Sequence, residues 1–161
     1  MNKARCERLT ATIDGDFAVF LIGMRINSVI QVRKWLPVAM AMPRMLKELR
    51  QRPELGLLHY EMWGGRTTLM VQYWRSVEQL LAYATNRQAE HLPAWQAFNR
   101  AVGMTGAVGI WHETYSVAAG RHESVYVNMP AFGLGKAAGL QPASGARHSA
   151  AGRLRLPQHQ R

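Results

Sequence analysis

The chain has little cysteine, no long apolar run and few acidic residues, and each shortage excludes a class of protein. Cys6 is the single cysteine among 161 residues, so no disulfide can form within the chain. The longest apolar run, residues 17–24, is far shorter than the roughly 20 residues that a membrane helix needs. Asp14 and Asp16 precede this run, where a secretory signal carries positive charge. We therefore expect a soluble protein in the reducing cytoplasm, with no membrane partner.

Motifs that hold metals or nucleotides are also missing. The sequence contains no C-x-x-C, no H-E-x-x-H and no close group of carboxylates and histidines, so we expect no metal site. Its glycines match neither a phosphate-binding loop nor a dinucleotide-binding fingerprint.

Acidic residues are absent from the carboxyl end. The net charge is +10, and residues 133–161 supply half of it with five basic residues and no acid. A basic tail of this kind can bind nucleic acid or an anionic surface. The competing interpretation is a solvated appendage, because residues 136–161 are rich in Gly, Ala, Ser, Arg and Gln. We expect this tail to be disordered, and we do not expect nucleic-acid binding.

The apolar patterns of the remaining chain alternate between strand and helix. Residues 17–24 are apolar on both alternating sets, which predicts a covered strand. A helical period follows from residue 28 to about 52, with a kink or new turn expected at Pro37 and a bend near Pro43. Two strands, 57–63 and 67–74, flank Gly64-Gly65, a strong signal for a two-residue hairpin turn.

The second half of the pattern completes a known arrangement. Ser76 and Gln79 form a capping box before a short helix, and further periods predict a helix at 89–102, a strand at 107–117 and one more short strand or arm at 124–129. The order βαββαβ predicts an α+β, ferredoxin-like antiparallel sheet with helices on one face. The first strand is apolar on both sides, so we expect the second face to meet a partner's sheet in a homodimer. The domain spans residues 13–135, and residues 1–12 are expected to be loosely held.

Several segments also resemble one family. The segments are LLHYEMW, LMVQYWRSVEQLLAYA, AEHLPAWQAFNRAVG, GIWHETY and VYVNMPAFGLGKA. They are similar to the uncharacterised-domain family grouped with the fumagillin-pathway polyketide monooxygenase, and more distantly to the dimeric α/β-barrel superfamily of antibiotic-biosynthesis monooxygenases. The resemblance covers about residues 15–138. It implies a cavity between sheet and helices in each subunit of a dimer, where relatives oxygenate polycyclic substrates, some without metal or flavin.

Such chemistry needs a polar group that accepts a proton or orients an anion, and a dry pocket. His91 would face this cavity from the predicted helix, while the competing interpretation has it bonded to backbone groups or solvent. His112 lies on a largely apolar strand face, where a satisfied core histidine is the alternative. Asn99 is a third candidate, as a group that orients a substrate oxygen. We predict these three as the catalytic residues.

The predicted substrate-binding residues are large or aromatic. Ordinary core packing, with each indole nitrogen satisfied, is the competing explanation for the tryptophans. The set comprises His59, Trp63, Trp74, Trp95, Phe98 and Trp111.

Three functions follow from these residues. The first is a cofactor-independent, monooxygenase-like enzyme acting on a small apolar or aromatic molecule. The second is a haem-binding enzyme using His91 or His112, because haem-degrading enzymes and aldoxime dehydratases share this barrel; the axial histidine of the haem-degrading branch falls about one turn after His91, where this chain has Trp95. The third is a non-catalytic ligand-binding protein, which a pocket lined only by Met, Leu and Trp would favour.

Overall fold

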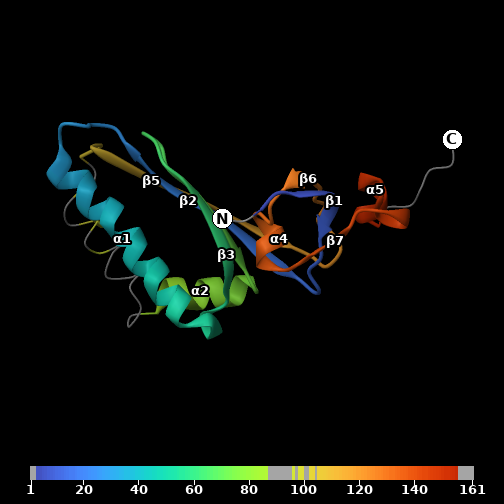
Figure 1. Ribbon diagram of the computed structural model, residues 1–161. Coiled ribbons are helices and arrows are strands. Elements are labelled where there is room, and N and C mark those ends of the chain that lie inside the picture. Colours follow the sequence, from blue (N-terminus) through green and yellow to red (C-terminus); the bar gives the residue numbers. More distant parts are fainter. Residues whose placement is uncertain (1–2, 87–95, 97, 100–101, 104, 156–161) are drawn as a thin grey trace.

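The computed structural model describes residues 3–86, 96, 98–99, 102–103 and 105–155 of the chain. Figure 1 shows two sheets side by side, a larger one with α1 and α2 on its outer side and a smaller one beside its opposite face. The larger sheet and its helices comprise β2 (Phe17–Ile26), α1 (Val32–Gln51), the 3-10 turn η1 (Pro53–Leu55), β3 (Leu57–Trp63), β4 (Leu69–Trp74), α2 (Val77–Thr85) and β5 (Val108–Val117). The smaller unit comprises β1 (Arg5–Ala11), β6 (Tyr126–Met129), α4 (Leu134–Ala137), β7 (Leu140–Pro142), η2 (Gly145–Arg147) and α5 (Ala150–Arg153).

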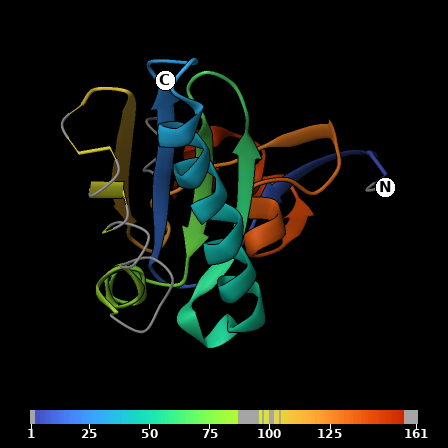
Figure 2. The same ribbon diagram turned by 90° about the vertical axis from the view of Figure 1, so that its left-hand side faces the viewer.

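The larger sheet has the strand order β3-β4-β2-β5, and all three pairings are antiparallel. With α1 between β2 and β3, and α2 between β4 and β5, this is the ferredoxin-like arrangement. The predicted fold class is therefore confirmed. Both long helices cover the same face of the sheet (Figures 1 and 2), which we call the helix face.

Helix α1 begins four residues later than the periodicity indicated and then runs without interruption through both prolines. The new first turn expected at Pro37 does not form. Both prolines are exposed to solvent, and neither belongs to the buried core beneath the helix. The shorter α2 begins as predicted, with the Ser76 hydroxyl accepting a hydrogen bond from the Gln79 backbone N–H at 3.2 Å.

The core beneath these helices centres on Trp74, whose side chain is 1% exposed. It packs with Ala18 of β2, Leu49 of α1 and Leu80 of α2. Alternate residues of each strand point to one face of a sheet, so Trp74 places Gln72 and Met70 on this face as well. This core fixes α1 and α2 against the sheet.

The connection between β3 and β4 is longer than the predicted two-residue turn. Trp63 pairs with Leu69, so residues 64–68 form the loop. The loop pairs with β2 instead of closing tightly: Ile26 N–H donates to the Arg66 carbonyl and Thr68 N–H donates to the Met24 carbonyl, both at 2.8 Å. Contacts with a strand 40 residues away thus override the local signal of the two glycines.

The amino-terminal segment also differs from expectation. Residues 5–11 form β1, the central strand of a second antiparallel sheet ordered β6-β1-β7. Leu9, Thr10 and Ala11 are buried there. The segment looked loosely held because both of its partner strands lie more than 110 residues away in the sequence.

The second face of the larger sheet is partly covered by this smaller unit. Phe17 of β2 and Leu134 of α4 are buried together with Ala11, against Val19 and Tyr73. The tail expected to be disordered from residue 136 instead contributes α4, β7, η2 and α5 within residues 136–155. A single chain therefore does not leave this face bare, as the sequence had suggested.

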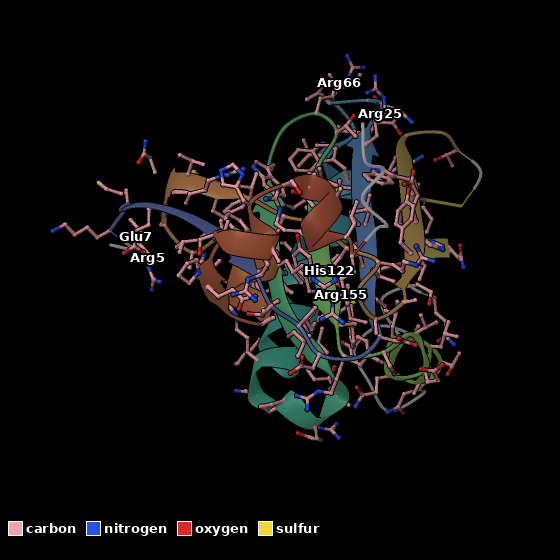
Figure 3. All side chains as sticks on the ribbon, turned by 90° about the vertical axis from the view of Figure 1, so that its right-hand side faces the viewer. Arg5, Glu7, Arg25, Arg66, His122 and Arg155 are labelled. Carbon is pink, nitrogen blue, oxygen red and sulfur yellow. The ribbon has the colours of Figure 1, made fainter. Side chains whose placement is uncertain are left out.

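The last described turn is fixed by an almost fully buried guanidinium. Arg153 pairs with the Glu123 carboxylate and donates to the carbonyls of Arg147 and His148 at 2.9 and 2.8 Å. Figure 3 shows His122 and Arg155 close together on the same side. Burial, aided by the positive charge of Arg155, lowers the pKa of His122.

No helix within the described ranges is long and apolar enough to cross a bilayer.

Candidate functional site

A cavity of about 270 Å³ lies between α1 and the helix face of the larger sheet. Five methionines line it, a side chain that adapts to irregular ligands. The remaining lining is also mostly apolar. The complete lining comprises Met24, Met42, Met45, Met62, Met70, Ile22, Gly23, Pro37, Val38, Ala39, Ala41, Arg44, Thr68, Leu69, Phe98 and Ile110.

The periodicities of strand and helix explain why these residues meet. Ile22 and Met24 are two positions apart on β2 and pair with strands whose lining residues, Met70 and Ile110, face the same way. On α1, Ala41 and Met45 are four residues apart and share the inner face. The small Ala41 side chain leaves room that a leucine or phenylalanine would fill.

The cavity opens to solvent beside the exposed edge strand β3. Met62, which lines it, is 57% exposed, and Pro37 and Arg44 of α1 are also exposed. The guanidinium of Arg44 thus gives this mouth a positive charge. An anionic oxygen on an otherwise apolar ligand would be stabilised there.

The inner wall is held by Thr68, whose hydroxyl is committed to the backbone of β2. It accepts from Met24 N–H at 2.9 Å and donates to the Met24 carbonyl at 3.3 Å. A buried chain of side chains supports the neighbouring wall: Trp74 Nε1 donates to Gln72 Oε1 at 2.8 Å, and Gln72 Nε2 donates to the Met70 sulfur at 3.2 Å. These polar groups shape the cavity and are satisfied by protein atoms.

Two of the predicted site residues, His91 and Trp95, lie outside the described residues. Of their neighbours, Phe98 lines the cavity, whereas Asn99 is exposed and lies outside its lining.

His112 lies on the helix face of β5, two residues beyond the cavity residue Ile110. Its ring packs against Phe20 with centroids 5.6 Å apart, and it is exposed. Trp111, its neighbour, points to the opposite face, where its indole nitrogen is buried without a hydrogen-bond partner in the described structure. Neither side chain belongs to the cavity lining.

The other predicted residues divide between the core and the second face. Trp74 is a core residue with a satisfied indole. Trp63 packs edge-on against Phe132 with centroids 6.0 Å apart, on the side of the smaller unit. His59 is on that side too, with its Nε2 3.0 Å from Glu61 Oε1. Among the described residues, the structure therefore does not bring the predicted histidines and tryptophans together at one place.

Glu61 is the centre of a polar cluster that fastens α4 to β3. Its Oε1 accepts from the Gly133 backbone N–H at 3.3 Å and from Lys136 Nζ at 3.2 Å, in addition to His59. Burial raises the pKa of Glu61, but the hydrogen bonds from His59, Gly133 and Lys136 together outweigh burial and leave its pKa below the usual value. The segment GLGKA, residues 133–137, therefore has a structural role, because its Gly133 and Lys136 hold α4 against β3 through Glu61.

We expect Glu61→Gln to lower the free energy of unfolding at neutral pH by about 1–2 kcal/mol, the usual value of hydrogen bonds to a charged group. The pKa of Glu61 is lower in the folded state, so its contribution is present above the unfolded pKa of about 4.3 and is lost as the pH falls through the lower folded value. Urea unfolding at pH 7 and at pH 3 measures this. The difference between wild type and variant should shrink at pH 3.

The matched control is Glu54→Gln, because Glu54 is an exposed carboxylate paired with Arg52. It should leave the unfolding free energy unchanged at both pH values. An equal effect of the two substitutions would refute the role assigned to Glu61.

Arg44 and the methionines of the cavity are not among the residues predicted from the sequence. The methionines carry no catalytic signature and fall at positions that any core residue can occupy. Arg44 follows Pro37 by seven residues and Ala41 by three, which is the spacing of one helix face. That spacing was the available signal.

Metal and haem binding can be tested on the donor groups present. No group of three or more His, Cys, Asp or Glu side chains that could hold a metal occurs among the residues described. The described lining offers no imidazole, thiolate or phenolate to haem iron, and the thioethers of its methionines serve as haem ligands together with a histidine, which this lining lacks. His112, the described candidate for an axial ligand, lies outside the lining, so the described residues do not fit haem.

The sheet order and its two helices define a ferredoxin-like fold with an apolar cavity beneath α1. A family model described as Monooxygenase af470-like matches residues 17–134. The chain belongs to this family.

Two similar proteins illustrate the relationship. Monooxygenase af470 of Aspergillus fumigatus (strain ATCC MYA-4609 / CBS 101355 / FGSC A1100 / Af293) is 35% identical over 94 residues, covering 55% of this chain. This chain spans only 33% of that protein's length. Among solved structures, aldoxime dehydratase (OxdRE) in complex with butyraldoxime matches with a TM-score of 0.65 at 15% identity, covering 81% of this chain and 39% of the other. The latter likeness shows the fold alone.

Proposed function

We propose that this chain is a monooxygenase-like enzyme that oxidises a small apolar or aromatic, polyketide-like molecule in the cavity beneath α1. The observation that carries the proposal is the cavity itself: about 270 Å³, lined by methionine and aliphatic side chains, in a member of a monooxygenase-like family. A pocket of this kind excludes water from a bound ligand and admits molecular oxygen, which is apolar.

The proposed reaction needs no cofactor when the substrate supplies the electrons. An acidic CH₂ group beside a phenol or ketone loses a proton to solvent water at the cavity mouth, and the carbanion adds O₂ to give a peroxide anion, which takes a proton back from water to form a hydroperoxide. Loss of water from the hydroperoxide leaves a carbonyl, so CH₂ and O₂ become C=O and H₂O. The four electrons come from the substrate, and no further reductant is required.

Arg44 is the residue to which we assign the anionic intermediate. Arg44 lines the cavity and is exposed, so its guanidinium would lower the pKa of a phenol or enol bound against it. No carboxylate or imidazole occurs in the described lining, so stabilisation of the substrate anion by Arg44 takes the place of a strong base among these residues.

A second candidate function is non-catalytic binding of the same class of ligand. The specific observation in its favour is that the polar side chains of the inner wall are satisfied within the protein and that His59 is paired with Glu61, far from the cavity lining. The two candidates share a ligand class and differ in oxygen consumption.

The test is Ala41→Phe, which fills the cavity from α1. We expect the affinity for a hydrophobic phenolic probe such as emodin anthrone to fall roughly tenfold or more, because a filled site cannot accept the ring. Oxygen uptake with this probe, followed by electrode, should fall in parallel. Ala82→Phe, the same change at an exposed position of α2, is the control and should leave both unchanged.

The outcomes separate the candidates. Binding with one O₂ consumed per carbonyl formed supports the enzyme. Binding without oxygen uptake supports the ligand-binding protein and rejects catalysis on this substrate class. Equal binding in wild type and Ala41→Phe would reject the cavity as the site.

We further propose that the chain forms a homodimer through the second face of the larger sheet. The smaller unit covers the part of this face around Phe17, whereas Tyr115 and Trp63 remain about half exposed beyond it. Exposed aromatic residues on a sheet face are typical of an interface. Light scattering should give twice the mass of one chain, and the mass of a single chain would reject the dimer.

A further inference from the structure

The outer side of α1 carries a stripe of exposed apolar side chains. Its members are Val29, Ile30, Val32, Leu36 and Met40, which we call the α1 stripe. Val32, Leu36 and Met40 are spaced by four residues and therefore lie above one another on the helix. Single exposed apolar residues are ordinary on a protein surface, but three aligned on a helix beside two more in the turn before it are characteristic of an interaction surface.

The tip of this stripe is held rigidly in its exposed position. Ile30 is 91% exposed and Val29 is 62% exposed. Yet the turn that carries them is anchored: Trp35 Nε1 donates to the Val29 carbonyl at 3.0 Å, and the backbone N–H groups of Asn27 and Ser28 both donate to the Ala107 carbonyl. A fixed turn that presents an isoleucine to solvent is suited to insertion into an apolar phase.

Charge identifies the partner. Between Asp16 and Glu48 the chain has no acidic residue and five basic ones, of which Arg33, Lys34, Arg44 and Lys47 lie on α1. Arg25 and Arg66 lie together at the end of the sheet beside the same turn (Figure 3). Apolar side chains flanked by Lys and Arg, without acids, are the signature of a helix that lies on an anionic lipid surface.

We propose that the α1 stripe docks on anionic phospholipid membranes, with Ile30 inserted and Arg33, Lys34 and Lys47 against the lipid phosphates. The protein would lie on the membrane surface, which is distinct from spanning it. Helix α1 faces the viewer in Figure 2, where it forms the outermost layer of the larger sheet. The proposal does not rest on the proposed function. If that function holds, docking also brings the mouth of the cavity, between α1 and Met62, close to a source of apolar substrate.

The experiment is co-sedimentation of the full-length chain with vesicles of equal parts phosphatidylcholine and phosphatidylglycerol, and with vesicles of phosphatidylcholine alone. We expect binding to the anionic vesicles and roughly tenfold less to the neutral ones. Ile30→Asp should weaken anionic binding roughly tenfold. Leu81→Asp is the matched control, because it places the same charge at an exposed leucine of α2 and should change binding less than about twofold.

A second pair guards against misfolded variants. Arg33→Glu should weaken binding more than Arg5→Glu, an identical charge reversal at an exposed position of β1, and all four variants should melt near the wild-type temperature.

Equal loss in Ile30→Asp and Leu81→Asp would overturn the proposal, because binding would then follow overall charge. No binding to anionic vesicles would overturn it as well. Conversion of a wild-type dimer into a monomer by Ile30→Asp would assign the stripe to a protein interface instead. Ligand affinity of the cavity is measured separately, so failure here leaves the proposed function intact.

Discussion

Gly23→Ala should destabilise the protein by at least about 3 kcal/mol and leave little folded material at physiological temperature. A Cβ atom at Gly23 would lie 2.0 Å from the Thr68 carbonyl oxygen and 2.6 Å from Trp111 Nε1. The carbonyl is backbone, and the loop that contains it is pinned to β2 by the hydrogen bonds between Thr68 and Met24. The Thr68 carbonyl cannot withdraw without breaking the hydrogen bonds between Thr68 and Met24 of β2, an inner strand of the sheet. Urea unfolding followed by tryptophan fluorescence measures the loss.

The control for this substitution lies in the neighbouring strand. A Cβ at Gly109 of β5 would meet atoms no closer than 3.8 Å, in Arg25 and Asn27, which is ordinary van der Waals contact. Gly109→Ala should therefore leave stability unchanged or raise it slightly, since alanine restricts the unfolded chain. A Gly23→Ala protein as stable as Gly109→Ala would show that the loop of residues 64–68 moves aside freely. It would also weaken the cavity geometry, because Gly23 and Thr68 both line that wall.

The larger sheet was predictable because its signals are local and repeated. Residues 57–63 and 69–74 alternate cleanly, Ser76 caps the next helix, and the order of elements admits few topologies. The smaller unit was not predictable in the same way. The buried residues of β1 lie only at its carboxyl end, so the strand has no alternating pattern along its length. Its partners, residues 126–129 and 140–142, lie more than 110 residues away, and a local sequence pattern does not indicate such distant pairing.

The candidate site shows the same division. Periodicity correctly places His59, Trp63 and Trp111 on strands, but their function depends on which face they occupy, and that is set by the register of the sheet. Of the predicted aromatic site residues that the structure describes, Phe98 is the one that lines the cavity. Aromatic and histidine residues attract attention in a sequence, whereas methionines at core spacing do not, although five of them make this pocket.

The second large effect is expected from removing residues 136–161. Once predicted to be a disordered tail, this segment holds Lys136 against Glu61 and supplies Leu140 of β7, which pairs with Ala11. A chain that stops after residue 135 should lose about 4 kcal/mol of stability, because Phe17 and Leu134 would be exposed to water and one edge of β1 would be unpaired. The measurement is urea unfolding of the truncated and full-length chains, with aggregation at low urea as the accompanying sign of an uncovered apolar face.

A chain that stops after residue 144 separates two explanations of that loss. It keeps α4, β7 and the buried Ala143, and gives up η2, α5 and the pairing of Arg153 with Glu123. Since the apolar cluster around Phe17 does not include those elements, the longer chain should retain most of the stability. Equal losses in the two truncated chains would place the stabilising contacts beyond residue 144, in the Arg153 cluster. A full-sized loss in the shorter chain alone would establish that the smaller unit, through α4 and β7, is a stabilising part of the domain.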